Sequence, residues 1–176
     1  RFKRVVAPTG KTVWVLSSHC QANLEADARA FTKLCAHLKA VDGDRRVIAL
    51  QIENEPGILG SDRDYGPEAQ VEFDRPVPSV LLDKLRAAGK GRVYDLWQAA
   101  GGTSPGTWPE VFGWAAGELL TAWSIASYID HIAAAGKAVY DLPMYINVWL
   151  GEGGWSIAGE TYPSGGAVSK VLDIYK

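Results

Sequence analysis

The sequence predicts an α/β fold in which parallel strands alternate with helices. Apolar runs at 47–53 and 142–150 are typical of strands that are buried on both faces, and segments with helical periodicity separate them. Strands so far apart cannot form a hairpin, so we expect parallel pairing with the helices outside. The first run ends in Glu53, Asn54 and Glu55. Carboxylates are therefore expected at the carboxyl end of the sheet, where α/β-barrel enzymes hold their catalytic groups.

The amino-terminal segment, residues 1–22, is expected to be irregular apart from a β-prone piece around Trp14. A helix is predicted over 24–41, because its apolar residues recur at 3.6-residue spacing. Asn23 is a candidate N-cap, and the Asp-Gly pair at 42–43 is expected to end the helix. The order of helix, turn and strand is half of a βαβ unit.

A long polar loop is expected over 56–78, directly after the first strand. Structureless loops longer than about 15 residues are usually functional or disordered. Because this loop begins at the carboxylates, we predict that it helps to form a site.

The second half of the chain is predicted to be largely helical. Ser79 is a candidate N-cap for a helix that Gly89 ends, and Gly136 is expected to end the longest helix. Thr107 and Glu110 have the spacing of a capping box. The expected helices cover 79–88, 92–100, 115–135 and 167–176.

Charge and hydropathy argue against several classes of function. The net charge is -2 and no run of Lys or Arg forms a basic stripe, so we expect no nucleic-acid partner. No apolar segment approaches the roughly 20 residues that span a bilayer, so we expect no membrane partner. No signal peptide is visible, which leaves the compartment open, a secreted or periplasmic one included. The dispersed His19, His37 and His131 predict no metal site.

The cysteines and aromatic residues add two further expectations. Cys20 and Cys35 have no paired spacing, so buried free thiols are favoured over a disulfide. Seven Trp and seven Tyr are a high content for 176 residues. Such side chains fill cores, and they also stack on the apolar faces of sugar rings.

The end of the first strand carries the predicted chemistry. By alternation, Gln51, Glu53 and Glu55 are expected on one face, with Glu55 nearest the rim. A carboxyl desolvated there has a raised pKa and can donate a proton to a leaving oxygen. Asn54 offers a donor and an acceptor to a sugar hydroxyl, and Pro56 stiffens the turn. The alternative is a surface turn, or for Glu53 a supporting role behind Glu55.

The second strand adds three candidate sugar-binding residues. Tyr145, Asn147 and Trp149 are expected on one face, with Trp149 at the rim, where it can stack on a sugar. The alternative for both aromatic side chains is core filling, which is favoured for Tyr145.

The segment from Gln51 to Glu55, followed by Pro and Gly, resembles the strand-four signature of retaining glycoside hydrolases built on the TIM barrel. It is most similar to family 35 β-galactosidases, which are related to families 5 and 42. Four further segments fit this resemblance, namely 23–31, 58–64, 133–137 and 142–150. The resemblance implies a partial (β/α)8 barrel, roughly strands three to six with their helices, and one partial catalytic domain over 1–176.

The resemblance further implies a retaining hydrolase of terminal β-galactosides or related β-linked sugars, with Glu55 as general acid/base and Asn54 on the sugar 2-hydroxyl. It implies no cofactor, a carbohydrate substrate as partner, and self-association if partial barrels must complete one another. The family nucleophile, a Glu at the end of strand seven, is expected outside this sequence. Glu152 and Glu160 are weaker candidates, because a flexible loop positions a group poorly. The alternatives are a family-5-type endo-β-glucanase or mannanase, and a non-catalytic sugar-binding fragment.

Overall fold

The protein has a mixed α/β fold, which a computed structural model describes for residues 1–150 and 157–176. One small sheet pairs β1 with β2 antiparallel, and the other pairs β3 with β4 in parallel. The strands are β1 (Arg4–Val6), β2 (Thr12–Leu16), β3 (Leu50–Asn54) and β4 (Met144–Asn147). The predicted α/β class and the parallel pairing of the later strands are confirmed. The described residues form no closed barrel.

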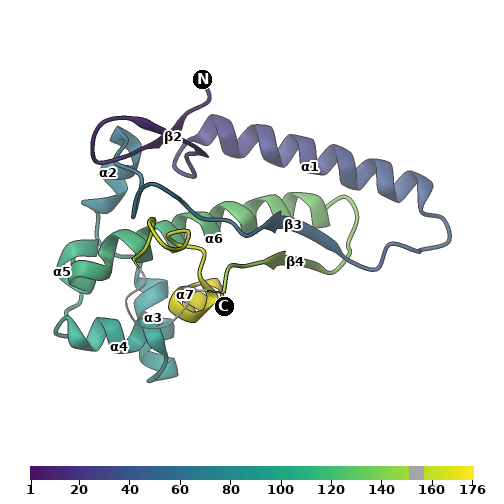
Figure 1. Cartoon of the computed structure of the whole chain (residues 1–176). Coiled ribbons are helices and arrows are strands. Elements are labelled where there is room, and N and C mark those ends of the chain that lie inside the picture. The colour runs from purple at the N-terminus through teal and green to yellow at the C-terminus, as the bar shows by residue number, and fades with distance from the viewer. Residues whose placement is uncertain (151–156) are drawn as a thin grey trace.

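Two long helices lie side by side, and the parallel pair β3–β4 lies along one of them, α6 (Figure 1). The described helices are α1 (Gln21–Val41), α2 (Pro67–Phe73), α3 (Ser79–Ala88), α4 (Arg92–Ala99), α5 (Trp108–Phe112), α6 (Ala116–Lys137) and α7 (Val168–Tyr175), with a 3₁₀ turn, η1 (Gly113–Ala115), before α6. The shorter helices α3, α4, α5 and α7 gather at the end of α6 that is remote from the sheet's amino ends (Figure 1). This arrangement makes α6 the central element.

The main apolar core lies among these gathered helices. Val93 of α4, Val111 of α5, Leu119 of α6 and Val171 of α7 are almost completely buried there. The first two turns of α6 are buried on all sides, and they include the polar residues Glu118 and Thr121. Burial of this apolar surface is the main favourable contribution to folding.

The helix α6 continues past Gly136 to Lys137, so the prediction that Gly136 ends it is wrong. Gly136 instead faces α1, where an added Cβ would lie 2.4 Å from Cε1 of Phe31 and 3.0 Å from Sγ of Cys35. The glycine is therefore needed for close packing of the two helices. Cys35 is fully buried and forms no disulfide, as expected.

The start of α1 also differs from the prediction. The N-cap position is Cys20, and Asn23 lies inside the helix with its side chain buried. The Asn23 amide donates to the backbone oxygens of Lys3 (2.8 Å) and Ser17 (2.9 Å). Asn23 therefore joins α1 to the amino-terminal sheet instead of capping the helix.

The predicted loop 56–78 contains α2, so it is not structureless. This helix has only seven residues, too few for a visible apolar period. The N-cap position of α3 is Pro78, and Ser79 is the first helical residue, so the predicted cap is also wrong.

Two other helix signals in the sequence are confirmed. Gly89 ends α3 in the left-handed conformation, with φ 60°. The backbone N–H and the hydroxyl of Thr107 both donate to Oε2 of Glu110, at 2.7 and 2.9 Å. The predicted capping box therefore begins α5.

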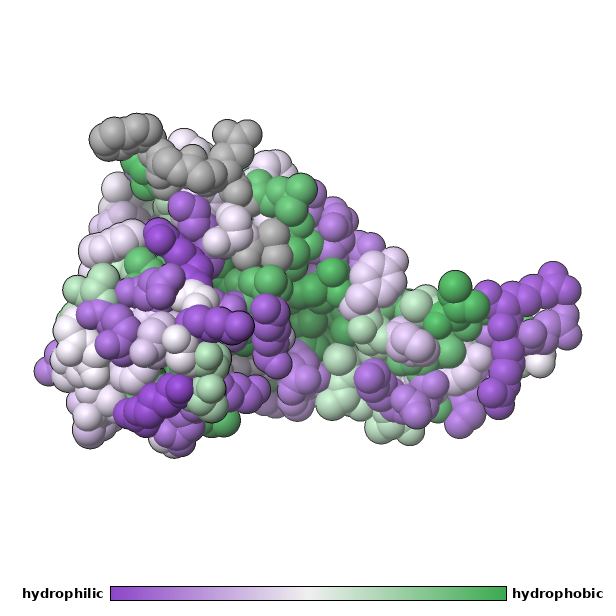
Figure 2. Space-filling view, turned by 90° about the horizontal axis from the view of Figure 1, so that it is seen from below, coloured by the Kyte–Doolittle hydropathy of each residue, from purple (hydrophilic) through white to green (hydrophobic). Residues whose placement is uncertain are grey.

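The strands β3 and β4 are shorter than predicted and half-exposed, so their expected burial on both faces is wrong. Ile48, just before β3, is 81% exposed, and Tyr145 in β4 is 53% exposed. Two strands with helices along one side leave the other side open. Seen from below, the surface of the molecule shows apolar side chains gathered in its middle (Figure 2).

The segment after β3 is joined to the amino-terminal sheet by Asp64, which is only 4% exposed. Its carboxylate accepts hydrogen bonds from the backbone N–H groups of Val6 (2.9 Å) and Gly66 (2.7 Å) and from the hydroxyl of Ser17 (2.6 Å). One carboxylate thus links β1, the turn before α1 and the start of α2.

We expect Asp64→Ala to lower the free energy of unfolding by about 3 kcal/mol, because it leaves three donors without their acceptor. Denaturant unfolding measures this loss. The control is Asp74→Ala, which removes only exposed hydrogen bonds from Gln70 and should cost less than about 0.5 kcal/mol. Equal losses for the two variants would contradict this role of Asp64.

Candidate active site

The carboxyl ends of β3 and β4 bring three of the predicted site residues together. Asn54 and Asn147 are the last residues of their strands, and Nδ2 of Asn147 donates to Oδ1 of Asn54 at 2.9 Å. The backbone N–H of Glu55 donates to the backbone oxygen of Asn147 at 2.6 Å. Gln51 also donates to Oδ1 of Asn54, at 3.2 Å. The strand end therefore joins three side-chain amides and the backbone N–H of Glu55 in one hydrogen-bonded group.

Glu55 adopts a left-handed backbone conformation, with φ 52°. This conformation is uncommon for residues other than glycine, and it turns the chain out of the strand direction directly after Asn54. The pairing register also shifts between Gln51 and Asn54. Because of these two irregularities strict alternation is lost. Glu53 and Glu55, two of the three residues predicted to share one face, line the cavity beside the strand, whereas Gln51 bonds to Asn54 and does not line the cavity.

This cavity has a volume of about 300 Å³ and lies between the end of β3 and the helices α1 and α6. Glu53 and Glu55 line it from the strand, and Asp27 and Tyr128 line it from the helices. The hydroxyl of Tyr128 donates to Oδ2 of Asp27. Three carboxyl groups therefore border one small space. Leu16, Ile58, Ile125 and Ile129 form apolar parts of its wall.

The surroundings of Glu53 favour its protonated form. Burial raises the pKa of Glu53 above its usual range, and the nearby Asp27 carboxylate raises this pKa further. Burial also raises the pKa of Tyr128, and the hydrogen bond to Asp27 adds to this effect. Tyr128 therefore stays a donor to Asp27, and Glu53 holds its proton longer than an exposed glutamate.

The segments that follow β3 and β4 pack directly on each other. Ile58 and Ser164 exchange backbone hydrogen bonds of 3.0 and 2.9 Å. A Cβ added to Gly166 would lie 1.8 Å from the backbone oxygen of Pro56. The backbone next to Glu55 is therefore positioned by a contact that only glycine permits.

The other predicted residues of the second strand lie outside the cavity. Exposure alternates along this segment, with Tyr145, Asn147 and Trp149 more exposed than Ile146 and Val148. The predicted common face of Tyr145, Asn147 and Trp149 agrees with this pattern. Trp149 is 37% exposed, and its backbone N–H donates to the oxygen of Gly166 at 3.2 Å. The structure therefore joins Asn147 to Asn54 and leaves both aromatic side chains on the open face.

The sequence interpretation missed Asp27 and Tyr128. They lie 101 residues apart, on α1 and α6. Only the apolar positions of these helices helped to predict the structure. No local spacing could have paired them. Of the weaker nucleophile candidates, Glu160 is exposed on a turn and Glu152 lies outside the described residues.

Comparisons with known proteins find no match, either among protein-family models or among curated proteins. Within the described residues, no group of three His, Cys, Asp or Glu side chains could hold a metal ion. None of the described helices is both long and apolar enough to cross a membrane.

We expect Gly166→Ala to lower the free energy of unfolding by about 1–3 kcal/mol, because the new methyl group overlaps the oxygen of Pro56. Thermal unfolding measures the loss, and the amide signal of Glu55 should shift in NMR spectra. Gly43→Ala is the control, since its Cβ would meet nothing within 4 Å. An undisturbed Glu55 signal in Gly166→Ala would contradict the proposed contact.

Glu53 should make stability depend on pH. Its folded-state pKa is raised, so its contribution to stability is complete below the ordinary value of 4.5 and is lost as the pH rises through the folded-state pKa. Glu53→Gln does not titrate. We therefore expect the unfolding free energy of this variant, relative to the wild type, to increase between pH 4.5 and neutrality. Parallel pH profiles from chemical denaturation would show that Glu53 is not perturbed.

Proposed function

We propose that the chain is part of a retaining glycoside hydrolase that cleaves terminal β-galactosides or related β-linked sugars, with Glu55 as general acid/base. One observation carries the proposal: Asn54 ends β3 and Glu55 follows it, beside Asn147, which ends the parallel neighbour. This is the edge of a parallel sheet where α/β enzymes place their reactive groups. The resemblance of the segment 51–55 to family 35 β-galactosidases supports the same role.

The chemistry assigned to Glu55 is proton transfer. Glu55 would protonate the glycosidic oxygen in the first step and deprotonate water in the second. Asn54 would bind the sugar 2-hydroxyl, and Asn147 would hold the Asn54 amide in place through the 2.9 Å hydrogen bond. Tyr145 and Trp149, on the open face of β4, would contact the sugar through their rings.

A retaining mechanism also needs a second carboxyl about 5 Å from the first. The resemblance assigns this nucleophile to a glutamate on a later barrel strand. Asp27 and Glu53 share the cavity with Glu55, but Asp27 accepts the Tyr128 hydroxyl and Glu53 favours its protonated form. Neither is therefore a good nucleophile.

The exposed sheet supports the finer proposal that the fold is part of a (β/α)8 barrel, roughly strands three to six. Parallel strands are normally covered on both faces, whereas Ile48, just before β3, and Tyr145 in β4 are largely exposed. The side chains of further barrel strands would cover this open face. If the chain hydrolyses sugars by itself, association of two copies would have to supply the cover and the second carboxyl.

Hydrolysis of nitrophenyl β-galactoside, compared with a β-glucan and a β-mannan, tests the substrate class. Release of nitrophenol with little action on the polymers supports the proposal. Preferred cleavage of a polymer favours the alternative of a family-5-type endo-β-glucanase or mannanase. Sugar binding without turnover favours the alternative of a non-catalytic sugar-binding fragment.

Where association of two copies allows the chain to hydrolyse nitrophenyl β-galactoside, we expect Glu55→Gln to lower kcat by about 10²–10⁴-fold without changing the fold. A substrate with a better leaving group, such as dinitrophenyl β-galactoside, needs less proton donation in the first step. It should therefore form the glycosyl-enzyme almost normally, and added azide should restore turnover by replacing water. Steady-state and burst kinetics measure both effects.

Glu160→Gln is the matched control, because this exposed carboxyl lies on a turn outside the cavity. It should keep wild-type rates on both substrates. Equal losses on the two substrates in Glu55→Gln, with no rescue by azide, would reject the acid/base role.

A further inference from the structure

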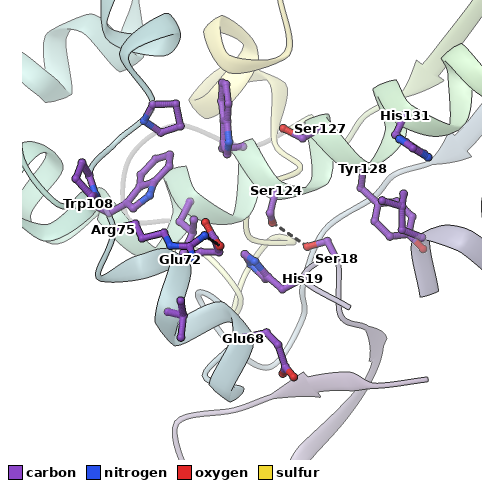
Figure 3. A pocket seen from close by; sticks show the side chains of 16 residues that line it. Ser18, His19, Glu68, Glu72, Arg75, Trp108, Ser124, Ser127, Tyr128 and His131 are labelled. Atoms are coloured by element: carbon purple, nitrogen blue, oxygen red, sulfur yellow. Dashed lines mark hydrogen bonds and ion pairs between the residues drawn. The ribbon is translucent and has the colours of Figure 1, made fainter. Parts of the chain in front are cut away.

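A second cavity, of about 580 Å³, adjoins the one at Glu55 and shares Ser18 and Tyr128 with it. It lies between the turn before α1, the helix α2 and one side of α6 (Figure 3). Its volume is within the range of small-molecule sites, about 300–1,000 Å³. Neither Glu53 nor Glu55 lines it.

Hydroxyl and imidazole groups form the middle of this cavity. The hydroxyls of Ser18 and Ser124 are hydrogen-bonded at 2.8 Å, and Ser127 lies one turn further along α6 (Figure 3). His19 is half-buried beside them. Burial lowers the pKa of His19, although the carboxylates of Asp64 and Glu72 oppose the shift, so its imidazole is neutral at neutral pH. These groups can both donate to a hydroxyl ligand and accept from it.

The charged side chains at the cavity are already paired. Arg75 forms an ion pair with Glu72 at 2.5 Å, and Glu68 forms one with Lys3. An anionic ligand would meet two carboxylates, and a cationic ligand would compete with Lys3 and Arg75. The charges therefore favour a neutral ligand.

Flat apolar side chains complete the wall. Trp108 and Trp123 both line the cavity, together with Pro76 and Pro78. Trp108 is 2% exposed and fixed in the core, whereas Trp123 is only half-buried on α6. A purely apolar ligand would fit these rings but would offer no hydrogen-bond partner to the serine hydroxyls and the imidazole.

We propose that this cavity is a binding site for a neutral carbohydrate of one or two pyranose rings, separate from the Glu55 cavity. A pyranose combines an apolar face, suited to the Trp123 ring, with hydroxyls suited to Ser124, Ser127 and the His19 imidazole. The proposal rests on the lining of this cavity and does not require that Glu55 is catalytic.

The test is an NMR titration of the ¹⁵N-labelled chain with methyl β-galactoside and with cellobiose. We expect a saturable shift of the Trp123 indole signal and of the Ser124 amide for at least one sugar. Ser127→Trp should weaken this binding at least about tenfold, because the exposed serine lies at the cavity and the larger ring fills it. The substitution removes no core contact, so the variant should fold.

Ala134→Trp is the matched control, since it adds the same ring to an exposed position of α6 outside the cavity. It should bind sugar like the wild type. Glu55→Gln should also leave these shifts unchanged, even if it removes hydrolysis. The two proposals can therefore fail separately.

Three results would overturn the proposal. The first is the absence of a saturable shift at Trp123 with either sugar. The second is sugar binding by Ser127→Trp that equals that of Ala134→Trp. The third is a shift caused by indole and by neither sugar, which would assign the cavity to an aromatic ligand.

Discussion

The contact between the segments that follow β3 and β4 is the constraint on which the candidate site depends. Ile58 and Ser164 exchange two backbone hydrogen bonds, and Gly166 touches the oxygen of Pro56. This antiparallel bridge joins the two segments beyond the parallel ladder of β3 and β4, and a two-stranded sheet has little cohesion of its own. It also offsets the strain of the left-handed Glu55, since such a conformation persists only where its surroundings determine it.

The buried polar groups carry this constraint to the rest of the molecule. Asp62 lies next to the amino-terminal end of α6, and its backbone oxygen accepts the hydroxyl of Thr121 at 3.1 Å. The guanidinium of Arg63 stacks on Tyr65 and Phe73, at 3.9 and 3.8 Å from the ring centres. The segment after β3 is therefore fixed by α6, by α2 and, through Asp64, by β1. A site built on it has a rigid support although the sheet is small.

The sequence predicted those features that depend on local physics. The α/β class, the parallel pair, the capping box at Thr107 and the helix end at Gly89 follow from periodicity and backbone preference. Long-range contacts decided the rest. Gly136 had the local signature of a helix end, yet packing against α1 requires it inside α6. Asn54 and Asn147 were predicted as separate candidates and their hydrogen bond was not predicted, whereas Asp27 and Tyr128 have no local pattern that marks them.

The neighbouring glutamates show why position has to be considered before acidity when a proton donor is chosen. Glu53 has the raised pKa that is typical of a general acid, but the Asp27 carboxylate causes part of that rise, from the helix side of the cavity. Glu55 follows Asn54 directly, and its backbone N–H donates to the backbone oxygen of Asn147. The Glu55 side chain therefore leaves the backbone next to the two asparagine amides that would bind sugar hydroxyls. A donor must reach the oxygen that it protonates. Geometry therefore favours Glu55, and Glu53 is better explained as the residue that keeps a second negative charge away from Asp27.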